Sequence, residues 1–188
     1  TGAARDIGIV TAQWVIGTAL YDLLSIEVGS DIDPSLKCRN LHWLSVPAQF
    51  AGNWTSVVLN LSGDLVGRAE AYASTFGGAG RGGRIAGTIA GRIAEIRAEA
   101  IGVGAGTGGT LQVNAPGGLI TVNNIPQDSS LAAADVSVRT GTLAGAVTFS
   151  PSSPVNGDIF ASGYITGPVT INGEFNGNIC GANISAGA

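Results

Sequence analysis

Runs of alternating apolar and polar residues, each too short for a helix, make up most of this 188-residue chain. The runs are rich in Val, Ile, Leu and Thr and end at Gly, Asn or Asp, as in LLSIEVGSDI, TSVVLNLSGDL and GDIFASGYITGPVTINGEF. A two-residue period places every second side chain on the same face of a strand, and Gly and Asn supply the backbone angles of tight corners. The pattern predicts a single all-β domain over residues 1–188, in which short strands bury one face.

The segment GRIAGTIAGRIAEIRAEAIG, residues 83–102, also carries a helical signal. Its first four isoleucines recur at i, i+4, i+8 and i+11, which is helical spacing. Gly87 and Gly91 would each cost about 1 kcal/mol in the interior of a helix, and the segments on both sides have the alternation of strands. We therefore favour two strands over one helix here, divided into RIAGTIAG and RIAEIRAEAIGV.

A short phrase recurs along the chain as IEVGSDI, LNLSGDL, ITVNNI and VTINGEF. It begins with apolar-x-apolar, continues with a few small or polar residues and an acid or Asn, and ends with an apolar residue. Its acid-or-Asn position is filled by Asp31, Asp64, Asn124 and Glu174. The copies are unequally spaced, which is typical of solenoids with loops inserted into some coils. We expect these four residues at corners of the coil, and loop insertions at residues 76–84 and 150–157.

The architecture that fits these features best is a parallel β-solenoid (β-helix) with short irregular coils. The alternative is an antiparallel β-sandwich, in which strands recur with clear hairpin turns. Asn-Gly pairs begin at Asn156, Asn172 and Asn176, and they suit hairpins as well as solenoid corners, where Asn side chains stack between coils.

Several stretches also resemble a known class of proteins. LSIEVGSDI, LSGDLVGRAEA, GTIAGRIAEIRA and GDIFASGYITGPVTINGEFNGNI look like the Gly-rich, imperfect repeats of bacterial extracellular parallel β-helix proteins, such as large planctomycete-type surface proteins and some adhesin passengers. The resemblance covers most of the chain. It implies a parallel β-solenoid with an extracellular or cell-surface role, and it transfers no catalytic residue to this sequence.

Composition and charge narrow the function further. Charged residues make up 12% of the chain, half the usual fraction for a soluble domain, and sparsely charged β structure tends to associate. The net charge is −4, with no basic stripe and no interleaved aromatics, so we expect no nucleic-acid partner. No apolar run approaches the roughly 18 residues of a membrane span. The chain contains no Met and begins TGAARD, so we expect either a processed form or a piece of something longer.

The candidate chemical motifs are weak. His42 is the only histidine, which excludes a three-His metal site within one chain. The stretch GAGTGG, residues 104–109, matches the glycine spacing of dinucleotide sites, but a strand pattern follows it where such sites need a helix. The stretch FGGAGRGGR carries arginines where calcium-binding repeats carry aspartates. We therefore predict a non-enzymatic protein without a cofactor, metal or catalytic residue.

The two cysteines, Cys38 and Cys180, lie far apart in sequence. In a continuous solenoid they would be separated by about 30 Å along the axis, whereas a disulfide needs Cα atoms within about 7 Å. Two options remain: buried thiols, or a disulfide between stacked subunits. Sequons that allow glycosylation begin at Asn53, Asn60 and Asn183.

Two functional hypotheses follow. The first is a structural surface protein that associates with itself, or with neighbouring surface proteins, through exposed strand edges in a filament, a layer or a longer solenoid. The second is a carbohydrate-binding or polysaccharide-degrading β-helix, with a groove where aromatic platforms stand beside acids such as Asp31 and Asp64. The available platforms in the first half of the chain are Trp14, Trp43, Trp54 and Tyr72.

Overall fold

The computed structural model describes residues 5–10, 15–16, 23–28, 35–48, 55–73, 83–103, 108–149 and 156–184, and within them it contains seventeen strands and no helix. The odd-numbered strands are β1 (Arg5–Val10), β3 (Leu23–Val28), β5 (Leu41–Ala48), β7 (Leu65–Ala73), β9 (Ile93–Ile101), β11 (Leu119–Ile125), β13 (Ser137–Leu143), β15 (Ile159–Ile165) and β17 (Ile179–Ile184). The even-numbered strands are β2 (Val15–Ile16), β4 (Ser35–Cys38), β6 (Thr55–Leu61), β8 (Gly83–Ile89), β10 (Thr110–Val113), β12 (Ser130–Ala133), β14 (Ala146–Phe149) and β16 (Val169–Ile171).

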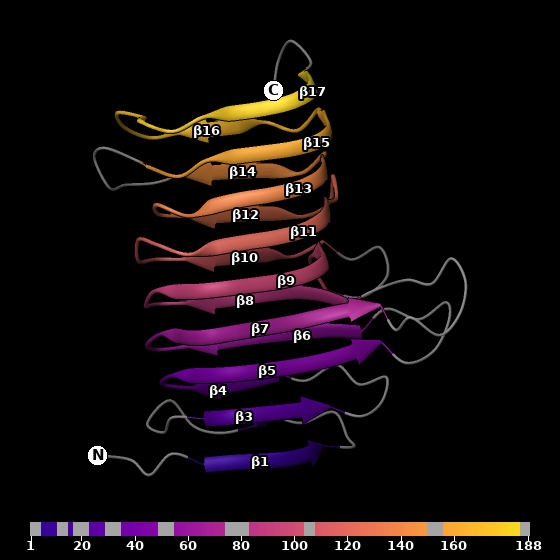
Figure 1. Ribbon diagram of the computed structural model, residues 1–188, viewed down its shortest axis with the longest axis vertical. Coiled ribbons are helices and arrows are strands. Elements are labelled where there is room, and N and C mark those ends of the chain that lie inside the picture. Colours follow the sequence, from indigo (N-terminus) through magenta and orange to yellow (C-terminus); the bar gives the residue numbers. More distant parts are fainter. Residues whose placement is uncertain are drawn as a thin grey trace.

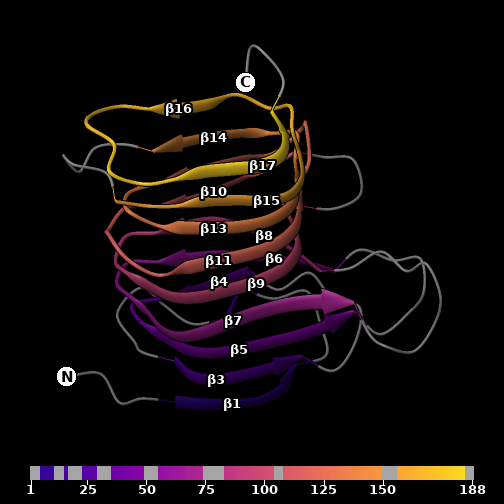
Figure 2. The same ribbon diagram turned by 45° about the horizontal axis from the view of Figure 1, so that its top comes forward.

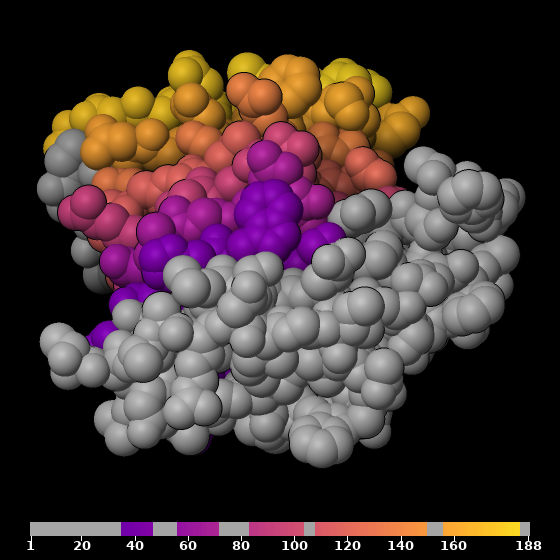
Figure 3. All heavy atoms as spheres, turned by 60° about the horizontal axis from the view of Figure 1, so that its bottom comes forward, coloured from indigo at the N-terminus to yellow at the C-terminus, as the bar shows by residue number. Residues whose placement is uncertain are grey.

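The chain winds as a parallel solenoid with two strands in each coil (Figures 1 and 2). Each odd strand pairs in parallel with the next odd strand, and each even strand with the next even strand, so the two series form two stacks. In the space-filling view the coils appear as bands that follow the order of the sequence (Figure 3). Because these pairings are all parallel, the solenoid is confirmed and the antiparallel sandwich is excluded.

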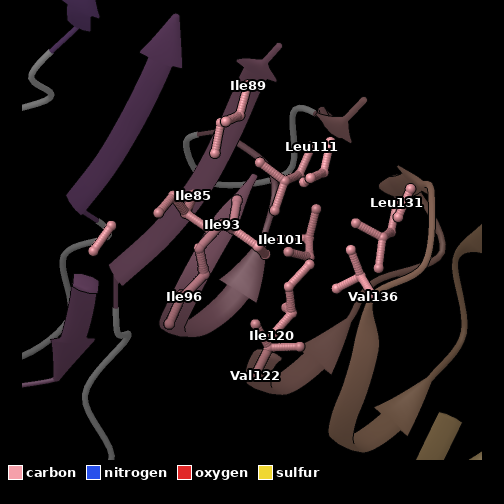
Figure 4. Packing of buried hydrophobic residues seen from close by; sticks show 14 of the residues in the cluster. Ile85, Ile89, Ile93, Ile96, Ile101, Leu111, Ile120, Val122, Leu131 and Val136 are labelled. Carbon is pink, nitrogen blue, oxygen red and sulfur yellow. The ribbon is translucent and has the colours of Figure 1, made fainter. Parts of the chain in front are cut away.

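The core lies between the two stacks and consists of rows of inward side chains. One row on the even strands runs through Leu61, Ile89, Val113, Ala133 and Phe149, which are directly paired from coil to coil and at most 3% exposed. Figure 4 shows how side chains from both stacks meet in this core. The alternation in the sequence thus corresponds to alternate burial, as in β10, whose residues are exposed, buried, exposed and buried.

The segment 83–102, for which strand and helix competed, forms β8 and β9. A bend at residues 90–92 separates the two strands, and each strand contributes two buried isoleucines near the bend. The intervals between these isoleucines therefore resemble helical spacing without a helix. Gly87 pairs with Leu59 and Leu111 in the ladder and has a positive φ of 118°, which residues with a side chain rarely adopt. The preference for strands is confirmed.

The predicted loop insertions are tested only at their ends. Gly83 and Arg84, assigned to the first insertion, are the first residues of β8, so this boundary was wrong. They are drawn into the sheet because they pair with Thr55 and Ser56 of β6. Residues 74–82 and 150–155 lie outside the described part of the chain.

Candidate functional site

Two rows of outward side chains cross the surface of the odd-strand stack. They are set by the strand register, because residues paired from strand to strand in a parallel sheet stand above one another. The first row is Trp43, Arg68, Glu95, Leu119 and Ser137. The second row is Ser45, Glu70, Arg97, Thr121, Arg139, Phe160 and Cys180.

A zigzag of ion pairs joins the two rows on β7 and β9. Arg68 pairs with Glu70 on its own strand, and its Nε donates to Glu95 Oε2 on the next coil at 2.8 Å. Arg97 Nε donates to the other oxygen of Glu95 at 2.6 Å. The Arg68 guanidinium also lies 5.3 Å from the centre of the Trp43 ring, a cation–π distance. One aromatic ring and four charges therefore form a single continuous cluster.

The electrostatics of this cluster favour its charged forms. Burial alone would raise the pKa of Glu95, but hydrogen bonds from Arg97 and Arg68 outweigh it and hold that pKa below its ordinary value. The hydrogen bond to Glu70 raises the pKa of Arg68, against a smaller opposing effect of burial. Both groups stay ionised at neutral pH, so the cluster presents balanced charges.

A groove follows these two rows along the solenoid axis. Its first recess, about 500 Å³, is lined by Trp43, Arg68 and Glu95 among others. A second, about 320 Å³, extends over Thr121 and Asn123, and a third, about 690 Å³, reaches β15 and β17. Leu119 lines all three recesses, so they adjoin one another along the two rows.

The outer surface of the even-strand stack is different. Its central row, from Lys37 at one end to Thr170 at the other, is otherwise filled by neutral residues, namely Asn60, Thr88, Gln112, Ala132 and Thr148. A single charge in a row of seven residues offers little to orient a polar ligand. The two outward rows of the odd strands therefore carry more charged side chains than this row of the even strands.

The corner that leads from an even to an odd strand carries a ladder of Asn and Asp side chains. Asn40 Oδ1 accepts a hydrogen bond from the backbone N–H of Asp64 at 2.7 Å, and Asp64 Oδ1 accepts one from the N–H of Arg92 at 2.8 Å. Each side chain therefore satisfies a backbone donor of the following coil. Asp64 is a structural corner residue, as its place in the recurring phrase predicted.

The same arrangement recurs near the other end. Asp135 Oδ1 accepts from the backbone N–H of Asn156 at 3.1 Å, and Asp158 Oδ1 accepts from the N–H of Asn178 at 2.8 Å. These aspartates lie outside the recurring phrase and were not predicted to be corner residues. The signal that could have found them is their position directly before an apolar run, as in Asp158 before β15.

The other members of the phrase do not share one position. Asn124 is inside β11, paired with Ala100 and Thr142, so its assignment to a corner was wrong. The phrase ITVNNI lies within a longer strand, and the turn comes only after Ile125. Glu174 is exposed in the connection between β16 and β17. Asp31 lies outside the described residues.

We expect Asp64→Ala to lower the free energy of unfolding by about 1 kcal/mol, because the Arg92 N–H loses its acceptor between two coils. Asp64→Asn keeps an oxygen at that place and should change stability by less than about 0.5 kcal/mol, as Asn40 fills the equivalent role one coil earlier. Urea unfolding of the three proteins measures both effects. If Asp64→Asn lowered the free energy of unfolding as much as Asp64→Ala, the charge of Asp64 and not its hydrogen bond would be what stabilises the corner.

The cysteines have different environments. Cys38 is fully buried in the core at the end of β4, whereas Cys180 is exposed on β17, and the two are not joined. The expectation of no internal disulfide is confirmed. The prediction that both thiols are buried was wrong for Cys180, which lies on an outward row. Cys38 is enclosed by the core and therefore cannot reach a second subunit.

The sequons and aromatic platforms are only partly described. Asn60 and Asn183 are exposed, and Asn53 lies outside the described residues. Trp43 lines a recess together with Arg68 and Glu95, so the acid beside this platform is Glu95. Asp64 instead accepts a backbone hydrogen bond at the corner. Trp14, Trp54 and the side chain of Tyr72 are outside the described part.

Two exposed aromatic residues of β15, Phe160 and Tyr164, were missed, with 54% and 58% of their surface exposed. The alternation in GDIFASGYI could have revealed them, since Ile159, Ala161 and Ile165 take the inward positions.

Within the described residues, no group of three or more His, Cys, Asp or Glu side chains could hold a metal ion. The same residues include no helix long and apolar enough to cross a membrane. Comparison of the chain with protein-family models, curated proteins and solved structures finds no match.

Proposed function

We propose that this chain is a non-enzymatic structural protein that stacks end to end with further copies, extending the solenoid into a filament or layer at the cell surface. The observation that carries the proposal is the half-covered core of the last described coil. An extracellular location is supported by the resemblance to Gly-rich surface repeats and by the low fraction of charged residues.

In the last described coil the inward rows continue but lose their cover. Val169 and Ile171 of β16 and Ile179 of β17 are only partly buried, although each continues a row of the core. Ile165 is fully buried, whereas Ile184, its partner on β17, is 55% exposed. Another coil on this end would bury these side chains at about 25 cal/mol for each Å² of apolar surface.

The strand edges at the two ends of the stack are complementary (Figure 1). In the described residues, β17 pairs only with β15 and β16 only with β14, while β1 pairs only with β3 and β2 only with β4. All of these pairings are parallel, so a second copy stacked head to tail presents β1 to β17 in the same direction. Main-chain hydrogen bonds across such edges are the basis of β-augmentation.

The register defines which residues would meet. An unbroken series of paired positions connects Ile9 of β1 with Cys180 of β17 across every odd strand. If the next copy continues this register, its Ile9 backbone lies about 4.8 Å from that of Cys180, within the Cα range of a disulfide.

We therefore expect Ile9→Cys to form covalent oligomers under mild oxidation, through disulfides between the introduced cysteine of one copy and Cys180 of the next. A ladder of dimers, trimers and longer products on non-reducing gels, with a peptide that links the two cysteines by mass spectrometry, is the measurement. Electron microscopy of the wild-type protein should show rods that lengthen with concentration.

Two controls make the test specific. Ile9→Cys combined with Cys180→Ser should give no ladder, and Val10→Cys, one position out of register, should cross-link far less. Wild-type protein that oxidises to dimers through Cys180 alone would show head-to-head contact and contradict the head-to-tail proposal. Monomers at all concentrations together with no ladder from Ile9→Cys would also reject it.

A further inference from the structure

The groove on the odd strands calls for a function beyond stacking, because most of its lining residues lie on coils away from the two ends of the solenoid. It crosses the coils from β5 to β17 parallel to the solenoid axis, a length of about 29 Å at about 4.8 Å per coil. Each of these strands contributes at least one lining residue or neighbouring outward residue to it. A long, open depression of this kind fits an extended chain of repeated units better than one compact molecule, which is normally enclosed in a deeper pocket.

The largest of the three recesses, about 690 Å³, is lined by side chains of the types that bind sugars. Phe160, which is 54% exposed, offers a flat apolar face to one side of a pyranose ring. Ser137, Asp158 and Asn178 line the same recess and provide hydroxyl, carboxylate and amide groups for ring hydroxyls. Exposed apolar surface beside several converging polar groups is the usual composition of a specific binding site.

Arg139 gives the groove its charge preference. It is paired in register between Thr121 and Phe160 and lines both the second and the third recess. Among the described arginines of the groove, Arg68 and Arg97 are ion-paired with glutamates, whereas Arg139 has no such pairing with a described carboxylate.

The nearby acids already have partners. Glu99 accepts a hydrogen bond from Asn123, and Asp158 accepts two from Asn178. Arg139 therefore presents an available guanidinium fork, which binds carboxylates in a bidentate manner.

We propose that this groove binds an extended polysaccharide that bears carboxylates, with a sugar ring on Phe160 and a neighbouring carboxylate on Arg139. The Trp43–Arg68 stack at the far end of the groove provides a second aromatic face for the same chain. The inference does not depend on end-to-end stacking, since every residue it uses lies on one copy.

The test compares two probes of equal length, a uronic-acid oligosaccharide and a neutral β-glucan oligosaccharide, by isothermal titration calorimetry at low and high salt. We expect the acidic probe to bind and to weaken with salt, and the neutral probe to bind much less. Arg139→Gln should weaken acidic binding about tenfold, and Phe160→Ala about fivefold.

Matched controls come from elsewhere on the molecule. Lys37→Gln removes one positive charge from the even face, and Tyr164→Ala removes an equally exposed aromatic from β15 outside the three recesses. Both should leave binding unchanged. Absence of acidic binding, equal binding of the neutral probe, or equal losses in Arg139→Gln and Lys37→Gln would each overturn the proposal, and unfolding curves of all variants exclude misfolding as a cause.

Discussion

Gly87→Ala is expected to destabilise the protein by about 3–5 kcal/mol, or to prevent folding, although it adds a single methyl group. Gly87 has φ +118°, a conformation that L side chains rarely adopt, and it lies in the middle of the stack. A Cβ placed there would be 2.0 Å from the carbonyl oxygen of Leu59. That oxygen belongs to the neighbouring strand of the same sheet, so relief requires two coils to separate.

Gly117→Ala is the matched control, because it isolates the cost of the backbone angle. Gly117 has φ +105°, but nothing lies within 4 Å of the position of its missing Cβ. Its substitution should therefore cost only the strain of the positive φ, about 1–2 kcal/mol. Chemical unfolding of both variants gives the comparison. Equal losses would mean that the tight contact with Leu59 relaxes freely, in contradiction to the rigid coil spacing on which the prediction depends.

Gly87 also illustrates why the strands could be predicted from the sequence. A solenoid coil needs only an inward residue at every second position and a corner that turns, and both leave local signatures. In residues 83–102, whose isoleucines have helical spacing, Gly87 and Gly91 still favoured strands, because glycine in the interior of a helix is destabilising.

The corners could be predicted only in part. Asp64 and Asn124 follow similar phrases, yet one caps the next coil and the other lies inside a strand. The phrase does not determine where the strand ends and the corner begins, because the coils differ in length. Ser130 pairs with Ala146, for example, whereas Val147 pairs with the more distant Val169.

The groove could not be predicted at all. It depends on which outward residues of successive coils stand above one another, as Arg68 and Glu95 do. That register is set by the lengths of connections whose sequence carries no period. Paired residues are 18 positions apart from Ile120 to Val138 but 21 apart from Val138 to Ile159, so no fixed interval identifies the partner of a given residue. Alternation alone could therefore identify outward positions, but not their neighbours.

Phe149→Ala is expected to lower the free energy of unfolding by about 3–5 kcal/mol. Phe149 is the largest fully buried side chain of the described residues, and it stands above Ala133 in the core row. The ring of Phe149 fills the space beside the small side chain of Ala133. The substitution would place two alanines next to each other in the row and leave a cavity, because the fixed spacing of the strands prevents the core from closing it. The exposed Phe160→Ala is the control and should change stability by less than about 0.5 kcal/mol.

The location of Phe149 makes its effect directional. It pairs with Ile171 of β16 and so supports the last described coil, whose inward residues are covered from one side only. Hydrogen exchange should therefore show the amides of β16 losing protection before those of β8 and β10 deeper in the stack. If that coil is the surface on which the next copy docks, Phe149→Ala at a temperature where the protein remains folded should also shorten the filaments. Uniform loss of protection along the stack would instead show that the coils unfold as one cooperative unit.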